Sequence, residues 1–238
     1  MTEIINTGER ILLEKETPLM IARHFCAYKF AKAYSCGKDV LDIGCGEGYG
    51  ANFLADFAKK VSGIDYDTDI INYAKNKYHK KNLEFSVMDI KDLGYLNQRF
   101  DVICSFQNIE HILDTHKLLK NILSLLKEEG IFICTTCNKK DASPGRDTPF
   151  NKFHVKEYLA HEFKELLEAH FHKVEVFGLE RGFALKFYRR LKKIGLFNFL
   201  PPNLDPVKKF YEKINCDNFT WTKKDIGSCL DFIAVCHK

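Results

Sequence analysis

Short apolar runs alternate with helical patterns along most of the chain. Six such runs, each four to six residues long, predict strands at 38–43, 61–64, 83–87, 100–105, 131–135 and 173–177. Between them, apolar residues recur every three or four positions, as in 114–126. Strands that alternate with covering helices form a mostly parallel sheet, and a last apolar run at 229–236 adds a seventh strand. The pattern predicts an α/β fold.

Two segments depart from this alternation, although we expect residues 1–238 to form a single domain. Thr17 and Pro18 are a favourable N-cap and first residue of a helix, so 1–36 is expected to contribute an N-terminal cover helix. Its polar side could instead close over a ligand. Before the last strand, 181–222 forms a basic helical insertion whose first helix, at 183–194, is amphipathic. This insertion is expected to be a lid or acceptor element, a dimer contact or a contact with a membrane surface.

The most informative stretch is the run from Val40 to Gly50. An apolar strand ends in an acid, Asp42, and glycines follow at every second position from Gly44. Such glycines let the backbone approach a ligand closely at the start of a helix. A dinucleotide fingerprint would need a third glycine where this chain has Tyr49, and the Gly-Lys-Ser/Thr of phosphate-binding loops is absent. An acid before the first glycine suits a ligand with a positive amino group.

This run strongly resembles motif I of the Rossmann-like, class I S-adenosylmethionine-dependent methyltransferases. The resemblance implies a Rossmann-like sheet of seven strands, mostly parallel with an antiparallel last strand, and helices on both faces. It also implies S-adenosyl-L-methionine as cofactor. The residues expected to bind it are Asp42, Gly44, Cys45, Gly46, Gly48, Tyr49, Asp65, Tyr66, Met88, Asp89, Ile90 and Gln107.

Two acids in this set have specific expected roles. Asp65 ends the second strand, 21 residues after Gly44, where a carboxylate can accept hydrogen bonds from both ribose hydroxyls. In the methyltransferase pattern Asp89, after the third strand, binds the exocyclic amine of adenine while apolar neighbours sandwich the ring. The alternative for Asp89 is that it only caps a turn.

The sequence Phe-Gln-Asn-Ile-Glu-His-Ile at 106–112 resembles a motif of small-molecule O-methyltransferases, typified by ubiquinone-biosynthesis enzymes. There the Glu-His pair faces the acceptor, which maps onto Glu110 and His111. Some relatives hold a divalent metal here, but this chain has Gln107 where they offer an acid, so no metal is expected. A neutral histidine can remove the proton of an acceptor hydroxyl near pH 7. The candidates are His111, which we favour, and His154; either could instead only bond the backbone of its loop.

Several further features look like a subgroup found with the biosynthesis of bacterial cell-surface sugars. They are the stretches at 7–10, 24–28, 46–50, 153–158 and 229–236. On this reading the acceptor is the hydroxyl of a sugar or nucleotide-linked sugar in capsular or other surface polysaccharide biosynthesis. Basic side chains of the insertion, with Arg146, could hold a diphosphate. RNA or protein methylation, N-methylation of a small molecule, and a binding module without chemistry stay open as alternatives.

Charge and composition narrow the partners. The net charge of +4 is too small to indicate a nucleic-acid-binding protein, although 181–224 carries eleven lysines and arginines against three acids. No run of about 18 apolar residues predicts a transmembrane helix, and 1–16 lacks an apolar signal core. We therefore expect a cytoplasmic protein, with its nine cysteines reduced and a homodimer possible.

Overall fold

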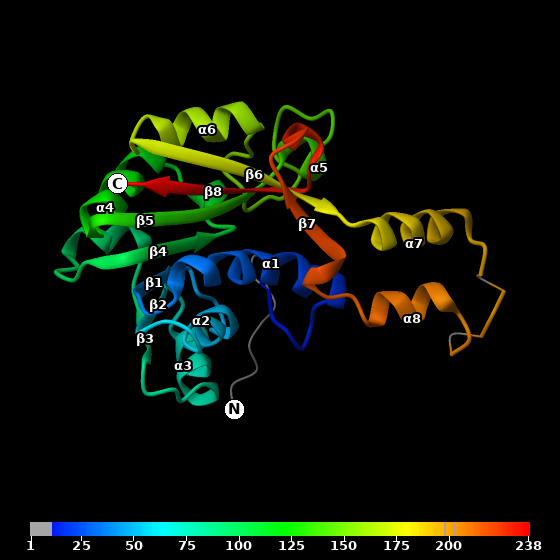
Figure 1. The fold of residues 1–238 in the computed structure, drawn as a ribbon, viewed down its shortest axis with the longest axis horizontal. Helices are drawn as coiled ribbons and strands as arrows, with labels where there is room; N and C mark the ends of the chain where they lie inside the picture. Colours follow the sequence, from blue (N-terminus) through cyan, green and yellow to red (C-terminus); the bar gives the residue numbers. More distant parts are fainter. Residues whose placement is uncertain (1–10, 198, 202) are drawn as a thin grey trace.

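The computed structural model describes residues 11–197, 199–201 and 203–238. Its centre is one sheet with the strand order β3-β2-β1-β4-β5-β8-β6-β7 (Figure 1). Strands β1 to β5 run parallel to one another, whereas β8 is antiparallel to both β5 and β6. The strands are β1 (Asp39–Ile43), β2 (Lys60–Asp65), β3 (Leu83–Val87), β4 (Phe100–Phe106), β5 (Leu126–Cys137), β6 (Lys173–Arg181), β7 (Phe219–Thr222) and β8 (Asp231–His237).

Within the described residues the sheet has eight strands, so the expectation of seven is wrong. The additional strand is β7, which pairs antiparallel with β6 at the edge of the sheet. It lies inside the segment 181–222 that the sequence suggested to be a helical insertion. Its residues alternate between apolar and polar, Phe-Thr-Trp-Thr, and Phe219 is buried while Thr220 is exposed. This period of two is the signal that predicts a strand, but it extends over four residues only.

Helices cover both faces of the sheet, as predicted. Neighbouring residues of a strand point to opposite faces, and Val40 packs with α1, α2 and α3 while Leu41 packs with α4 and α6. The first face is covered by α1 (Pro18–Ser35), α2 (Tyr49–Leu54) and α3 (Thr68–Lys77). The second is covered by α4 (Thr115–Leu125), α6 (Ala160–Glu168) and the 3-10 helix η1 (Ile90–Tyr95).

Helix α1 begins where the sequence predicts. Thr17 is the N-cap, and its hydroxyl accepts a hydrogen bond from the backbone N–H of Met20 over 3.3 Å. The helix packs on α2 through Tyr28, whose ring occupies the space that a side chain at Gly50 would need. Glycine at position 50 therefore allows the close approach of the two helices.

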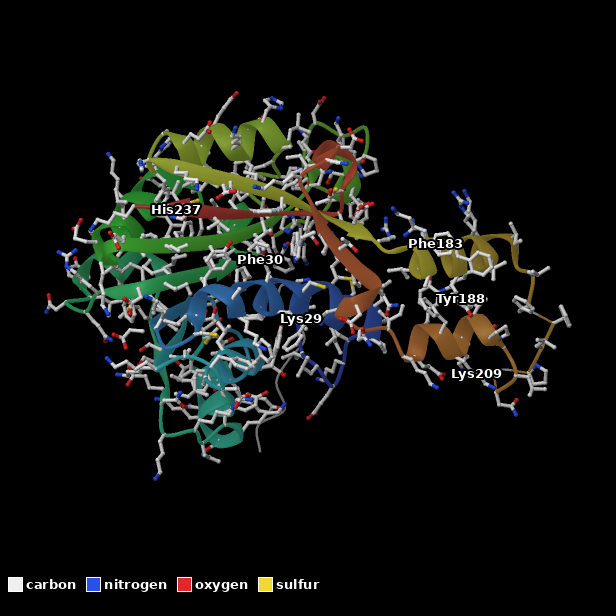
Figure 2. The ribbon with its side chains drawn as sticks, in the orientation of Figure 1. Lys29, Phe30, Phe183, Tyr188, Lys209 and His237 are labelled. Carbon is white, nitrogen blue, oxygen red and sulfur yellow. The ribbon has the colours of Figure 1, made fainter. Side chains whose placement is uncertain are left out.

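The remaining helices are short apart from α7 (Phe183–Ile194). They are α5 (Lys139–Ala142), α8 (Pro206–Glu212), η2 (Ile109–His111), η3 (Cys216–Asn218) and η4 (Ile226–Ser228). Figure 1 shows α7 and α8 extending from one end of the sheet. They lie side by side because Tyr188 and Phe210 stack with ring centres 4.1 Å apart (Figure 2). Leu185 and Ile214 connect this pair to α1 through a small apolar cluster with Ala22 and Cys26.

Among the described residues, no helix combines the length and apolar character needed to cross a lipid bilayer. The stretch at 7–10, which contributed to the subgroup resemblance, lies outside the described residues.

Candidate active site

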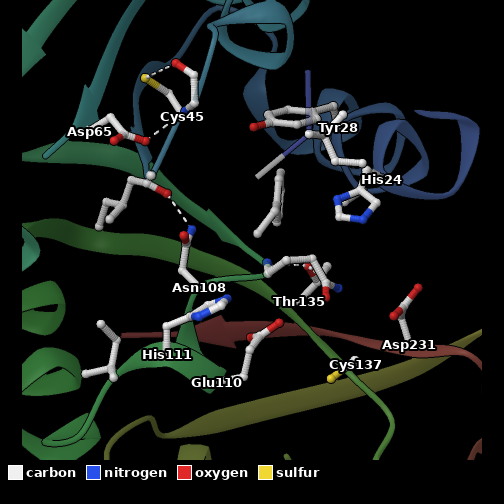
Figure 3. A pocket seen from close by; sticks show the side chains of 18 of the residues that line it. His24, Tyr28, Cys45, Asp65, Asn108, Glu110, His111, Thr135, Cys137 and Asp231 are labelled. Carbon is white, nitrogen blue, oxygen red and sulfur yellow. Dashed lines mark hydrogen bonds between the residues drawn. The ribbon is translucent and has the colours of Figure 1, made fainter. Parts of the chain in front are cut away.

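A cavity of about 490 Å³ opens at the carboxyl ends of β1, β2 and β4, with α1 along one side. Ligands of parallel α/β sheets bind at this edge, and the volume is within the range of small-molecule sites. Figure 3 shows side chains that line it from several elements, with Asp65 and Cys45 on one side and Glu110, His111 and Asp231 across from Tyr28 and His24.

The loop after β1 forms one wall of the cavity. Its backbone is left-handed at Gly44 and Gly46, with φ of 69° and 54°, which glycine adopts without strain. A side chain at Gly44 would collide with Asn108, whose amide donates to the carbonyl of Ile43 over 2.8 Å. At Gly46, among the described residues other than its two chain neighbours, no atom lies within 4 Å of the position that a Cβ would occupy. The loop therefore lets a ligand approach the backbone closely at Gly46.

Asp42 and Gly48 are the two predicted cofactor residues that do not line this cavity. Asp42 is fully buried, and its carboxylate accepts a hydrogen bond from the Tyr28 hydroxyl over 3.2 Å. Burial raises the pKa of Asp42 to about 7. Gly48 is the N-cap of α2 with φ of 86°, and a side chain there would lie 2.7 Å from the ring of Phe85. Both residues therefore support the loop after β1 from its buried side and do not face the cavity.

Asp65 and Tyr66 line the cavity at the end of β2. Asp65 is buried, and its carboxylate accepts hydrogen bonds from the backbone N–H groups of Gly46 and Asp67, both over 3.1 Å. The acid therefore ties the glycine loop to the next turn. Asp65 also lines the cavity, and its predicted contact with the ribose stays a prediction.

Met88, Asp89 and Ile90 line the cavity beyond β3, as the sequence suggested. Asp89 also caps η1, because one of its carboxylate oxygens accepts from the backbone N–H of Lys91 over 2.9 Å. The turn-capping alternative is thus part of the geometry, and it occupies one oxygen of the carboxylate. The other oxygen lies 3.9 Å from the Lys91 amine.

Cys45, Tyr49 and Gln107 complete the set of predicted cofactor residues along the cavity. Gln107 has a φ of 54°, which is unusual for a residue with a side chain. Hydrogen bonds to Thr135 hold it there, from its backbone N–H over 3.0 Å and from its side-chain amide over 3.3 Å. Strained backbone that is held in this way concentrates at functional sites.

Glu110 lines the cavity from η2 and is buried. One carboxyl oxygen, Oε2, accepts a hydrogen bond from Thr136 over 3.1 Å, while the other, Oε1, has no partner among the described residues. Burial raises the pKa of Glu110 to about 8, so the side chain is mainly a neutral acid at pH 7. As a neutral acid it can donate a hydrogen bond, which a carboxylate cannot.

The structure brings both candidate histidines into the same cavity, with ring centres 4.9 Å apart. His111 Nδ1 lies 2.9 Å from the carbonyl oxygen of Phe153. Since a carbonyl oxygen only accepts, Nδ1 carries a hydrogen and Nε2 is the nitrogen that can take up a proton. The backbone contact expected in the alternative for His111 therefore exists, and the role of His111 as a base stays a prediction.

His154 uses both of its ring nitrogens within the protein. Nδ1 lies 2.8 Å from the buried carboxylate of Glu157, and Nε2 lies 3.0 Å from the side-chain amide nitrogen of Asn151. The oxygen of the same amide accepts from the backbone N–H of Phe153, which fixes its orientation. His154 therefore bonds side chains rather than the loop backbone, and it holds the loop on which the His111 contact depends.

Ligand atoms of Glu110, Cys137 and His154 lie within 4.8 Å of one another, so this set could surround a metal ion. However, the imidazole nitrogens of His154 are already bonded to Glu157 and Asn151. The expectation that the protein works without a metal stays a prediction.

Several cavity residues were outside the set of site residues predicted from the sequence, although Arg23 and His24 belong to the polar side of α1 that the alternative for this helix placed over the ligand. Arg23 of α1 makes a two-pronged ion pair with Asp231, with N–O distances of 2.6 and 2.7 Å, and both side chains line the cavity. Trp221 reaches the cavity from β7, so it was missed together with its strand. The other lining residues include Tyr28, Asn108, Thr135 and His24, whose pKa burial lowers to about 4.

Comparison with known proteins agrees with this geometry. Residues 35–184 match the model of a methyltransferase domain family. A "Probable S-adenosylmethionine-dependent methyltransferase" of Mycolicibacterium smegmatis is 36% identical over 182 residues, which are 75% of this chain and 70% of that protein. A ubiquinone biosynthesis O-methyltransferase of Coxiella burnetii is 35% identical over 105 residues, 43% of this chain and 45% of that protein.

The fold is also that of solved methyltransferase structures. A chain from the complex between the Haloferax volcanii Trm112 methyltransferase activator and a methyltransferase superposes with a TM-score of 0.62 at 20% identity, covering 92% of this chain and 91% of that one. At this identity the likeness concerns the fold alone. The family match and the sequence relatives identify the cofactor as S-adenosylmethionine, and this chain belongs to the S-adenosylmethionine-dependent methyltransferases of the Rossmann-like class.

Proposed function

We propose that this methyltransferase transfers the methyl group to a hydroxyl of a small molecule, and that the acceptor is a sugar or nucleotide-linked sugar. The observation that carries the proposal is His111. It lines the cofactor cavity with Nδ1 committed to a backbone carbonyl, so that Nε2 is the basic nitrogen. A hydroxyl must lose its proton as the new C–O bond forms, whereas a neutral amine needs no base for its attack.

Cofactor binding divides among the cavity residues by chemistry. The Gly44–Gly46 backbone takes the methionine end, the carboxylate of Asp65 accepts from the ribose hydroxyls, and Asp89 accepts from the adenine amine. Met88 and Ile90 supply apolar contacts to the base. Gly46 supports this arrangement, because the absence of a side chain there leaves room for the cofactor close to the protein backbone.

The reaction is an in-line displacement in which S-adenosylmethionine, when bound, supplies the electrophilic methyl group on its sulfonium. His111 accepts the acceptor's hydroxyl proton at Nε2, and the Phe153 carbonyl stabilises the imidazolium through Nδ1–H. Glu110, held neutral by burial, donates a hydrogen bond that orients the acceptor. His154 positions the loop through Glu157 and Asn151 rather than touching the proton.

The similarity to the ubiquinone biosynthesis O-methyltransferase of Coxiella burnetii supports oxygen as the methylated atom. The sugar class rests on the resemblance noted in the sequence, most of which falls on described residues, and on the basic groups near the cavity. Surface polysaccharide biosynthesis is the setting that this resemblance favours.

The experiment is an acceptor screen. The protein is incubated with S-adenosylmethionine that carries a trideuterated methyl group and with a panel of nucleotide sugars, free sugars, small-molecule amines, RNA and protein. Mass spectrometry detects the added methyl group, and NMR locates it on oxygen or nitrogen. We expect an O-methylated nucleotide sugar. Transfer to RNA, protein or an amine with no sugar product would overturn the proposal.

A further inference from the structure

A second cavity, of about 330 Å³, lies beside the active site between α7, the end of β6 and η4. Its lining contains five basic side chains and one acid: Arg181, Lys186, Arg189, Arg190, Lys193 and Glu180. The acid is already neutralised, because Glu180 pairs with Lys186 over 2.6 Å. The cavity therefore has a strong excess of positive charge.

The charge is organised by the helix. Positions 186, 189, 190 and 193 are three, four and seven residues apart, which puts all four side chains on one face of α7. In the part of the chain that the structure describes, Arg189, Arg190 and Lys193 have no carboxylate within ion-pair distance. A row of like charges on one helix face is unfavourable by itself, so it favours an anion that neutralises several of them together.

Arg181 connects this cavity to the active site. Its guanidinium lies 3.7 Å from Asp141, a residue of the active-site cavity, and Asp141 also lies 3.8 Å from Arg23. Burial and the positive charge of Arg189 lower the pKa of Arg181. The two cavities also meet at consecutive residues of the chain, because Cys229 and Leu230 line the second cavity and Asp231 lines the first.

From this geometry we propose that the second cavity is an anion subsite, which holds the phosphate or diphosphate of the acceptor while its hydroxyl is in the active-site cavity. This deepens the proposed function and rests on it for the identity of the acceptor. Arginine forks match phosphate oxygens in pairs, which explains why three of the five cations are arginines. Arg146 is not among the residues that line the second cavity, and its guanidinium lies over the Phe150 ring, 5.4 Å from the ring centre.

The first test needs no methyl acceptor. Titration calorimetry measures binding of inorganic pyrophosphate, with acetate for comparison, to the wild type and to the double variant Arg189→Gln, Arg190→Gln. The matched control is Lys208→Gln, Lys209→Gln, which removes the same charge from exposed positions of the neighbouring helix α8 (Figure 2). S-adenosylhomocysteine binding shows that each variant is folded.

We expect pyrophosphate to bind the wild type and the control alike, with affinity that falls as salt rises. The double variant should bind it about 10 to 100-fold more weakly, as for the loss of charge-assisted hydrogen bonds. Absence of binding to the wild type, or equal binding by the double variant, would overturn the subsite. These outcomes do not depend on whether the acceptor is a sugar.

The second test links the subsite to turnover. With the acceptor found in the screen, the double variant should raise KM about tenfold or more and leave kcat close to that of the wild type, and pyrophosphate should inhibit competitively against the acceptor. Unchanged KM together with noncompetitive inhibition would contradict the link between the two cavities.

Discussion

At the scale of single residues, the carboxylate of Asp65 combines a structural and a proposed binding role. It holds the N–H groups of Gly46 and Asp67 and faces the cofactor cavity. We expect Asp65→Ala to raise the Kd for S-adenosylhomocysteine about 10 to 100-fold, because hydrogen bonds to a charged group contribute roughly 1.5–3 kcal/mol. Calorimetry measures this, and Asp92→Ala, an exposed acid outside the cavity, is the control. Equal affinity of both variants would disprove the assignment.

Glu110 predicts a dependence of stability on pH. Its pKa is about 8 in the folded protein and near 4.5 when exposed. Between these values the folded state keeps a proton that the unfolded state loses, so this contribution to stability is fully present below about pH 4.5 and is lost as pH rises toward 8.

In the variant Glu110→Gln this titration is absent. The free energy of unfolding of the wild type, relative to that of the variant, should therefore fall by up to about 1.4 kcal/mol per pH unit across this range. Urea unfolding at several pH values measures the difference. Parallel profiles for the two proteins would show that Glu110 is not a buried neutral acid.

The sequence could predict the residues that touch the cofactor cavity through a local motif, but not those that depend on distant partners. Ten of the twelve predicted cofactor residues line the cavity; Asp42 and Gly48 are the exceptions. The Asp42 carboxylate accepts a hydrogen bond from Tyr28. Tyr28 belongs to α1, a helix that precedes the strand of Asp42 in the chain. The Arg23–Asp231 ion pair joins opposite ends of the chain, so nothing near either residue indicates it.

At the scale of elements, the pattern of apolar residues predicted the succession of most strands and helices along the chain but not every boundary. The apolar residues that follow the glycine loop, from Ala51 to Ala58, predict a helix over 49–60, but α2 ends at Leu54. The carbonyls of Ala55 and Ala58 that follow it are bound by the side-chain amide of Asn82 over 2.8 and 3.1 Å. This contact from another segment stabilises a turn where the local sequence favours a longer helix. Strand β7 was not predicted because its alternating pattern is too short.

The contact between α1 and α2 gives a prediction for Gly50. A methyl group there would enter the ring of Tyr28 and force the two helices apart. We expect Gly50→Ala to destabilise the fold by about 1–3 kcal/mol, as overpacking does, and to weaken cofactor binding because Tyr28 lines the cavity.

The control is Gly227→Ala, since a Cβ at Gly227 would meet only the Lys140 amine, 4.0 Å away. Chemical unfolding and cofactor titration measure both effects. An unchanged midpoint for Gly50→Ala would mean that α1 does not pack on α2 as described.

At the scale of the whole molecule, the active site is assembled from segments far apart in the sequence. Helix α1, the glycine loop, the loops after β4 and β5, and Trp221 of β7 all reach one cavity. The fold class followed from the sequence because strand and helix periods are local. The active-site cavity, with the basic second cavity beside it, could not be predicted from the sequence, because it requires the insertion to return to the sheet as β7. A homodimer through the insertion at 181–222 stays a prediction.

The most direct test of His111 as the general base is the turnover of His111→Gln with the acceptor found in the screen. We predict a kcat lower by about 10² to 10⁴, the usual contribution of a general base, while the Kd for S-adenosylhomocysteine stays close to that of the wild type. His161→Gln, at an exposed histidine outside the cavity, should keep full activity. A His111→Gln variant that binds the cofactor normally and turns over at the wild-type rate would show that His111 is not the general base.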